Sequence, residues 1–506
     1  MIKTRSAKWL APIALAAGLA TSSVALAASE VRIGVVNDYA GWNPYADSTA
    51  QMYMTWCQTY GCLGTFDTRD GKYKGILAER WEVSKSNPNE WTFYLKKGIK
   101  RHVDGKELTA EDVAHSIWRN KNDKRSAQKQ NTRPVTSWKV IDKYTIKFFT
   151  KKPTAPLLSF IFDRLIITGK DLYDKHGTKA DRKTPWGYGP YMVKDIIIGQ
   201  RMVIEKNKNW PGIKKANPDV IVFKKIKEAE ARITGLMNGE LHMAQFIPPH
   251  LLKRVRANKN VVVKATAPVE VMFLAMNMKF KPWDNKKVRQ AVAYAINRKA
   301  IVKSIFQGGA SLLHGPVGPG QYGYSPDVTP KYSYNPAKAK QLLAEAGYPN
   351  GLAIDFYTAN GRYINDRFSS QAIVPMLEAV GFKVKFHTPE YSTQWPMVRK
   401  GKRSFYYQGR GSVVDPSAAI AQYFQTGVAP RIMYSNPELD ATLAAERQEF
   451  DPEKRKKLLL KAFNIIQDEV PAFFLWRINQ YYGISKKIDF TPTSTDRMFG
   501  FDITVK

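Results

Sequence analysis

The chain has 506 residues, of which 44% are hydrophobic, and this composition excludes an intrinsically disordered protein. At about 150 residues per domain, the length predicts two to four domains. The net charge is +34, but lysine and arginine are spread along the chain rather than gathered in one block, which disfavours a nucleic-acid-binding protein. The excess of positive charge could attract an anionic ligand or surface, or it could be a general property of the protein's exterior.

Residues 1–27 predict a secretory signal peptide. A basic start is followed by a short apolar run at 10–20 and by an Ala-Leu-Ala cleavage site that ends at Ala27. The run is too short to span a bilayer, and Ala28 offers no cysteine for a lipid anchor. We therefore expect a soluble periplasmic protein, cleaved near Ala27, whose net charge falls from +34 to +31 when three basic residues are removed.

A strand, a loop and a helix are expected next, at 30–36, 37–45 and 48 to about 63. The two cysteines, Cys57 and Cys62, fall on this predicted helix. Five residues apart on a helix, they would point to different faces and could not pair. We therefore favour two buried free thiols, with a disulfide as the alternative that an exported protein allows.

The stretch that follows is predicted to contain a hairpin, a capped helix and a further strand. The hairpin strands are expected at 81–85 and 90–95, and the strand at 144–150. Thr109 and Asp112 have the spacing of a reciprocal cap at a helix start. These elements lie in a block that could form a subdomain of its own.

The middle of the chain carries the best-specified helix. An apolar run at 271–275 predicts a strand, Asp284 stands at the expected N-cap, and apolar residues recur behind it at helical spacing. That face consists of Val288, Ala291, Val292, Ala295 and Ile296. We expect this stretch to mark the passage from one lobe to the next, because strands and hairpins precede it and alternating helices and strands follow.

The second half of the chain alternates helices with strands, which indicates an α/β lobe with helices packed on a sheet. Asn335, Asn436 and Asp451 each precede a proline. We expect each of the three to cap a helix, because Asn and Asp suit the N-cap and proline suits the first turn.

Signatures of catalysis are missing from the sequence. The stretch 318–323 matches GxGxxG, but Pro319 lies inside it and no helix is predicted after it, so it is a loop rather than a dinucleotide site. The seven histidines lack the spacing of a metal site, and 409–413 does not match the nucleophile elbow. We expect no catalytic residue, no cofactor and no metal, and a protein that closes on a small solute between two lobes.

Several stretches resemble, in the same order along the chain, the solute-binding proteins of peptide/nickel/opine-type ABC importers, solute-binding protein family 5. They cover essentially the whole mature chain. The stretches are LAERWEV at 77–83, WTFYLKKGI at 91–99, DGKELTAEDV at 104–113, GYGPY at 187–191, NMKFKPWDNKKVRQAVAYAI at 277–296, YNPAKAKQLL at 334–343 and GYP at 347–349.

The resemblance implies an α/β, two-lobed periplasmic-binding-protein fold, a clamshell with an extra subdomain in the first lobe. Lobe one would comprise 28–66, 187–277 and 487–506, the extra subdomain 67–186, and lobe two 278–486. A small-molecule solute would bind between the lobes, and the closed form would dock on an inner-membrane ABC permease. We expect a monomer and no nucleic-acid partner.

The resemblance also bears on the ligand. Peptide-binding members hold the peptide's ammonium with an aspartate just before an Asp-Pro or Glu-Pro pair. Here the pair is Asp415-Pro416, whose aspartate is expected to cap a structural turn, and the anchor position falls on Ser412. A serine hydroxyl is a poor partner for a buried ammonium, which disfavours an ordinary peptide ligand.

Other positions match ligand contacts of the family. Arg362 lies near the position where dipeptide receptors place an arginine on the ligand carboxylate, and Arg410 and Gly411 adjoin the anchor position. Either arginine could instead lie on the surface. The remaining matches are the lobe-one loop residues Asn37, Asp38 and Tyr39, and Trp395, an aromatic position often near the ligand that could also merely pack the lobe.

We therefore predict a periplasmic receptor for a peptide-like or anionic organic solute, such as an opine, a sugar conjugate or a modified peptide. An ordinary di- or oligopeptide receptor is the alternative. A nickel-complex receptor is disfavoured because 405–416 contains no histidine. An exported hydrolase and a basic interaction or chaperone protein fit less well, since the first lacks a nucleophile pattern and the second would bind partners in a salt-dependent way.

Overall fold

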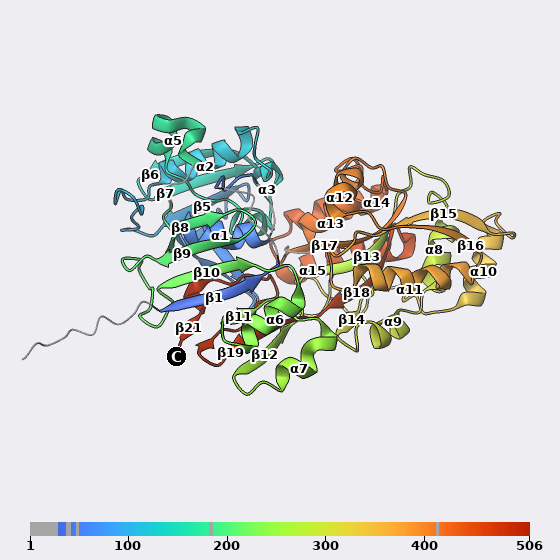
Figure 1. Ribbon diagram of the computed structural model, residues 1–506. Coiled ribbons are helices and arrows are strands. Elements are labelled where there is room, and N and C mark those ends of the chain that lie inside the picture. The colour runs from blue at the N-terminus through green and yellow to red at the C-terminus, as the bar shows by residue number, and fades with distance from the viewer. Residues whose placement is uncertain (1–28, 37–41, 47–49, 182–185, 411–413) are drawn as a thin grey trace, which may run out of the picture.

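The chain folds into two lobes that lie side by side, as Figure 1 shows for the computed structural model. This arrangement confirms the predicted two-lobed α/β architecture. The structure describes residues 29–36, 42–46, 50–181, 186–410 and 414–506.

Lobe one is built on a seven-stranded sheet in the order β12-β19-β11-β1-β10-β9-β8. Strand β1 pairs in parallel with β10 and buries Val31, Ile33 and Val35, as expected for a strand in the middle of a sheet. The sheet strands are β1 (Glu30–Val35), β8 (Tyr191–Ile197), β9 (Arg201–Lys206), β10 (Val220–Lys225), β11 (Met243–Ala244), β12 (Val261–Thr266) and β19 (Gln480–Ser485). The other elements of this lobe are α1 (Ala50–Thr59), α6 (Ala229–Met237), η2 (Pro249–Leu251), α7 (Leu252–Arg256), β20 (Ile488–Asp489), η3 (Gly500–Asp502) and β21 (Thr504–Val505).

The block predicted as an extra subdomain, 67–186, carries a separate four-stranded sheet in the order β4-β5-β7-β6. Thr109 and Asp112 form the predicted reciprocal cap at the start of helix α2. The elements in and beside this block are β2 (Gly64–Asp67), β3 (Lys72–Gly75), β4 (Ala78–Val83), β5 (Glu90–Leu95), α2 (Ala110–Asn122), α3 (Lys129–Thr132), β6 (Val135–Asp142), β7 (Thr145–Thr150), α4 (Leu157–Ile161), α5 (Lys170–His176) and η1 (Gly177–Asp181).

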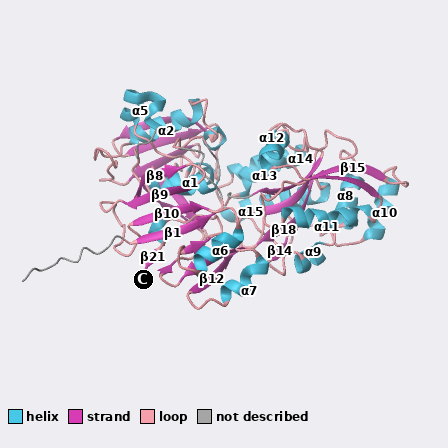
Figure 2. Cartoon of the chain, viewed as in Figure 1, coloured by secondary structure: helices cyan, strands magenta, loops and turns pink. Residues whose placement is uncertain are grey.

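Lobe two is built on a six-stranded sheet in the order β14-β18-β13-β17-β15-β16, and helices cover both of its faces (Figure 2). Every residue of β13 is buried, and alternate residues enter different cores: Met272 and Leu274 pack among α8 to α11, whereas Val271 and Phe273 pack among α12 to α15. The strands are β13 (Val271–Met276), β14 (Ala310–Leu312), β15 (Leu352–Tyr357), β16 (Phe382–His387), β17 (Phe405–Arg410) and β18 (Ala472–Ile478).

The helices of lobe two begin at caps that the sequence largely predicts. Asn335, Asn436 and Asp451 each accept a backbone hydrogen bond at the N-cap, as expected. For α8, however, the cap is Asn285 rather than Asp284, because the Asp284 carboxylate pairs with the ammonium of Lys281 at 2.6 Å. The helices are α8 (Lys286–Ala295), α9 (Arg298–Ser304), α10 (Pro336–Glu345), α11 (Asp366–Glu378), α12 (Tyr391–Arg399), α13 (Pro416–Phe424), α14 (Pro437–Gln448) and α15 (Pro452–Glu469).

No helix among the described residues combines the length and the apolar character that a membrane crossing requires. The signal peptide predicted at 1–27 lies outside the described residues.

The chain passes between the lobes at two adjacent places, β12 to β13 and β18 to β19. Thr266 and Gln480 are paired across the two passages, and we call this region the lobe crossing. Strand β13 therefore belongs to the second sheet and β19 to the first, which corrects the boundaries expected at 277 and 486. The physical reason is burial: β13 has helices on both faces and pairs with β17 and β18, so it cannot belong to lobe one.

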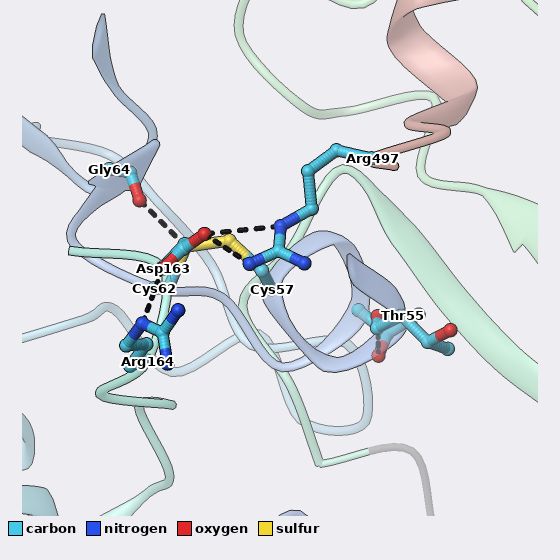
Figure 3. Close-up of a disulfide and its surroundings, with 8 residues drawn as sticks. Thr55, Cys57, Cys62, Gly64, Asp163, Arg164 and Arg497 are labelled. Atoms are coloured by element: carbon cyan, nitrogen blue, oxygen red, sulfur yellow. Dashed lines mark hydrogen bonds and ion pairs between the residues drawn. A yellow bond between two sulfur atoms is a disulfide. The ribbon is translucent and has the colours of Figure 1, made fainter. Parts of the chain in front are cut away.

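Cys57 and Cys62 form a disulfide, so the expectation of two free thiols is wrong. Helix α1 ends at Thr59, earlier than predicted, and Gly61 turns the chain with a φ of +102°. Cys62 therefore leaves the helix and can return to Cys57. Figure 3 shows the bond beside Asp163, Arg164 and Arg497.

Candidate functional site

The predicted ligand residues fall into two groups. Asn37, Asp38, Tyr39, Gly411 and Ser412 lie outside the described residues. Arg362, Trp395 and Arg410 are described, and the structure brings all three to one wall of lobe two, which faces lobe one. Aromatic rings and one further arginine connect them, as follows.

Arg410 ends strand β17, where it is paired with Val271. Its Nε is buried without a hydrogen-bond partner, and no carboxylate within the described part of the chain forms an ion pair with it. Burial, together with the nearby guanidinium of Arg431, lowers the pKa of Arg410 to about 10. The side chain is therefore still protonated at neutral pH and carries a charge with which no described carboxylate pairs directly.

A second arginine, Arg431, lies next to Arg410 and was missed by the sequence reasoning. Its guanidinium carbon is 5.1 Å from the ring centre of Trp395 and 4.8 Å from that of Tyr423. Its Nη1 donates to the Oε1 of Gln422 at 3.0 Å, and no described carboxylate pairs with it. The ring of Trp395 therefore lies within cation–π distance of the Arg431 guanidinium.

Arg362 lies farther along the same wall. Its guanidinium carbon is 4.8 Å from the ring centre of Tyr363 and 5.2 Å from that of Tyr391. Burial alone would lower the pKa of Arg362, but the two tyrosines and the Glu270 carboxylate outweigh it and raise the pKa. The side chain is exposed to solvent although protein surrounds it on most sides, as expected for a group that faces the space between two lobes.

Two carboxylates, Glu270 and Asp496, lie at the lobe crossing. Burial raises the pKa of Glu270, although Arg362 and Arg410 oppose the rise. Burial also raises the pKa of Asp496, to about 7, and the negative charge of Glu270 adds to it. The two acids are therefore close enough to repel each other, and neither was singled out by the sequence reasoning. We call Arg362, Arg410, Arg431, Glu270 and Asp496 the interlobe site.

The opposing wall belongs to lobe one. The Arg164 guanidinium lies 4.9 Å from the ring centre of Tyr53, and Arg497 pairs with Asp163 (Figure 3). The Cys57–Cys62 disulfide lies directly behind this wall, because Cys62 bridges to Ile166 beside the same segment. The positive charge of Arg164 contributes to lowering the pKa of Arg410, so charged groups of both lobes meet here.

The extra subdomain contacts lobe two away from the crossing, and we call this set of contacts the rim. The main-chain N–H of Ala155 donates to the carbonyl oxygen of Arg447 at 2.7 Å. The rings of Trp91 and Phe450 lie 6.0 Å apart. The lobes thus touch at the rim as well as at the lobe crossing.

Asp415 lies behind the wall rather than on it. Its carboxylate caps α13 by accepting from the N–H of Ser417 at 3.0 Å. It also accepts two hydrogen bonds from Arg455, at 2.6 and 2.8 Å, in a buried cluster with Glu446. These bonds occupy the carboxylate in a structural role.

The pocket beside Arg410 is about 20 Å³ in volume. A drug-sized ligand typically needs at least about 300 Å³, so this pocket is not the binding cavity of an organic solute. The residues that line it are mainly apolar, and Arg410 is one of them.

Chemically, the interlobe site offers charge and flat aromatic surface rather than a reactive group. Among residues placed by the structure, no three His, Cys, Asp or Glu side chains group as metal ligands. Arginines with no acidic partner suit carboxylates or other oxygen-rich anions. The two acids at the crossing suit a cation.

Comparison with known proteins gives a consistent family. The family model of bacterial extracellular solute-binding proteins, family 5 Middle, matches residues 72–431. The glutathione-binding protein GsiB of Salmonella paratyphi A is 28% identical over 480 residues, which is 92% of each chain.

Two solved structures share the fold. The periplasmic binding protein DppA of Helicobacter pylori, in complex with the peptide STSA, has a TM-score of 0.83 at 24% identity and covers 94% of this chain and 98% of its own. AgaA of A. tumefaciens R10, in complex with agropinic acid, has a TM-score of 0.82 at 22% identity, with coverage of 94% and 99%.

Proposed function

The chain belongs to the bacterial extracellular solute-binding proteins of family 5, which serve ABC importers, and we propose that it is a periplasmic receptor for a small peptide-like or anionic organic solute. The solute binds between the lobes at the interlobe site and is delivered to an inner-membrane permease. The receptor acts as a monomer and does not catalyse a reaction.

The observation that carries the proposal is the pair Arg410 and Arg431, two neighbouring cations without a described acidic partner. Placing like charges together in a partly buried position costs free energy unless an anion compensates for them. A ligand carboxylate can accept parallel hydrogen bonds from a guanidinium and remove this cost. An unliganded protein would not need such an arrangement for stability.

The ligands in the names of similar proteins agree with this chemistry. Glutathione, the peptide STSA and agropinic acid are all organic acids of similar size. The positive charge of the chain, +34 before and +31 after removal of residues 1–27, would also favour the approach of an anionic solute over several ångströms beyond direct contact.

Native mass spectrometry of the purified protein, followed by titration calorimetry, tests the proposal. The panel contains glutathione, the tetrapeptide Ser-Thr-Ser-Ala, an opine acid and a neutral oligosaccharide. We expect saturable binding of at least one acid with a stoichiometry of one. Failure of every acid to bind, with no co-purifying solute, contradicts the proposal.

A further inference from the structure

We propose that the solute carries a protonated amine, and that this amine binds at the lobe crossing between the carboxylates of Glu270 and Asp496, with the side-chain oxygen of Gln480 as a third acceptor. This inference rests on the proposed function, because it specifies which chemical group of the solute meets which end of the interlobe site.

The two carboxylates come from segments that the fold holds side by side. Glu270 directly precedes β13, and Asp496 belongs to the C-terminal segment of lobe one. The N–H of Val269 donates to the carbonyl oxygen of Ser494 at 2.8 Å, so the segments are fixed one residue before Glu270 and two before Asp496. The juxtaposition of the acids therefore follows from main-chain contacts and does not depend on flexible side chains alone.

At the lobe crossing the protein offers more hydrogen-bond acceptors than donors. Asp496 receives the Nε2 of Gln480 at 3.2 Å and the hydroxyl of Tyr482 at 3.3 Å. Glu270 makes no hydrogen bond or ion pair with any residue that the structure describes. Glu270 is half-buried, so its carboxylate is accessible to a donor from outside the chain.

Gln480 adds a second, independent sign of a missing donor. Its side chain is 6% exposed, and only its NH₂ group can donate to Asp496, which fixes the orientation of the amide. The Oε1 on the same planar group is consequently left buried without a donor. Since buried polar atoms are nearly always paired, this oxygen indicates that a donor from outside the chain belongs here.

A protonated amine meets all of these requirements. It brings up to three N–H donors and a positive charge, so it can bond to Glu270, Asp496 and Gln480 together. It also removes the repulsion between the two carboxylates. A calcium ion is a poorer fit, because it needs six to eight oxygen ligands, and the described residues contain no cluster of three metal-binding side chains.

The arginines set the orientation of the solute. Arg362 and Arg410 both act on the charge of Glu270, so the acidic crossing and the basic wall adjoin each other. If the amine of the solute binds at the crossing, a carboxylate of the same solute a few bonds away would meet Arg362 and Arg410. An amino acid derivative with at least one acid group has this polarity, and a simple dicarboxylate or a neutral sugar does not.

The test compares ligands that differ only in the charge of the amine. Calorimetry is performed with glutathione and N-acetylglutathione, and with Ser-Thr-Ser-Ala and its N-acetyl form. For the natural chain we expect the free amine to bind roughly 10- to 100-fold more tightly, the effect of a charged hydrogen bond. Any solute that co-purifies is identified by mass and is expected to contain an amine.

Glu270→Gln and Asp496→Asn remove the acids one at a time. We expect each to weaken the free amine roughly tenfold or more and to leave the N-acetyl form unchanged, so that the preference disappears. Asparagine tolerates the φ of +59° at position 496, so Asp496→Asn preserves the backbone. Glu240→Gln, an exposed carboxylate of lobe one, is the matched control and should retain the preference.

Two different failures can be told apart. Equal binding of free and acetylated forms, an unchanged preference in both acid variants, or a co-purifying solute without an amine overturns the amine site and leaves the receptor function standing. Absence of binding by every compound, with the melting temperature of the natural chain unaffected by all of them, overturns the receptor function and the amine site together.

Discussion

The main-chain N–H of Ala155 and the carbonyl oxygen of Arg447 join the two lobes through a 2.7 Å hydrogen bond at the rim. Because both partners are main-chain atoms, the bond does not depend on the identity of either side chain. Together with the lobe crossing it gives the two lobes a second place of contact. The chain supplies these contacts between the lobes without a ligand.

Removing a side-chain contact at the rim should favour opening. Phe450→Ala deletes the ring that meets Trp91 and leaves the core side of Trp91 in place. Since an aromatic pair contributes about 0.5–1.5 kcal/mol, we expect solute affinity to fall about two- to tenfold. Small-angle scattering should show a larger radius of gyration for the ligand-free variant. Phe368→Ala, at a ring that is 63% exposed, is the control, and an equal effect there would contradict the prediction.

Arg410→Gln should affect binding and stability in opposite directions. The affinity for an acidic solute is expected to fall roughly 10- to 100-fold, because a charged hydrogen bond is lost. The ligand-free protein should unfold at a higher denaturant concentration, because an uncompensated cation is removed from a partly buried position. Calorimetry and urea unfolding measure the two effects. Loss of stability, or an unchanged affinity, would show that Arg410 has a structural role instead; the exposed Arg399→Gln is the control.

The stability of the ligand-free protein should fall with rising pH through the titration of Asp496. Its pKa is raised from 3.8 to about 7 by burial and by Glu270, so the folded chain binds this proton more strongly than the unfolded chain. The stabilisation is complete below about pH 4 and is lost as the pH rises towards 7.

Asp496→Asn removes this titration. We expect the variant to be more stable than the natural chain by roughly 1–3 kcal/mol at pH 8, because each unit of pKa shift corresponds to about 1.4 kcal/mol and solvent contact reduces the full value. Below pH 4 the two proteins should be equally stable. Urea unfolding between pH 4 and 8 measures the difference, and parallel curves would rule out Asp496 as the responsible group.

The disulfide should stabilise lobe one. Cys57 and Cys62 are separated by five positions, and closing so short a loop is worth about 2 kcal/mol in the chain-entropy model. Cys57→Ala/Cys62→Ala is expected to unfold at lower denaturant by that amount, and a reducing agent should affect only the natural chain. The intact mass without reduction should be lighter by two hydrogens. Free thiols under non-reducing conditions would contradict the bond.

The local parts of the fold could be predicted from the sequence because they depend on neighbours in the chain. Asn335, Asn436 and Asp451 cap their helices through bonds to residues two or three positions away. Asp284 failed as a cap because its carboxylate had another partner, Lys281, within the same turn. Cys62 was misplaced because Gly61 was not recognised as the residue that ends the helix.

The composition of the interlobe site depends on distant segments and could be predicted only in part. Arg362, Trp395 and Arg410 were selected by resemblance and lie near one another in the structure, and their contact with a ligand stays a prediction. Arg431 and Asp496 have no local signature, since an arginine after a loop and an aspartate near the C-terminus are common. Asp496 stands out only when the main-chain bond from Val269 to Ser494 brings residues 270 and 496 together, and Arg431 only when its guanidinium is placed over Trp395 and Tyr423.

The position of Glu270 and Asp496 also bears on the order in which a solute is recognised. Atoms at the axis of a rotation move least, and the lobe crossing is the place about which two lobes joined in this way would turn. A group bound there would keep its surroundings while the lobes are apart, whereas Arg362, Arg410 and Arg431 would travel with lobe two. The amine could therefore bind at the crossing before the lobes close. The acid groups of the solute would meet the arginines of lobe two only once closure is complete.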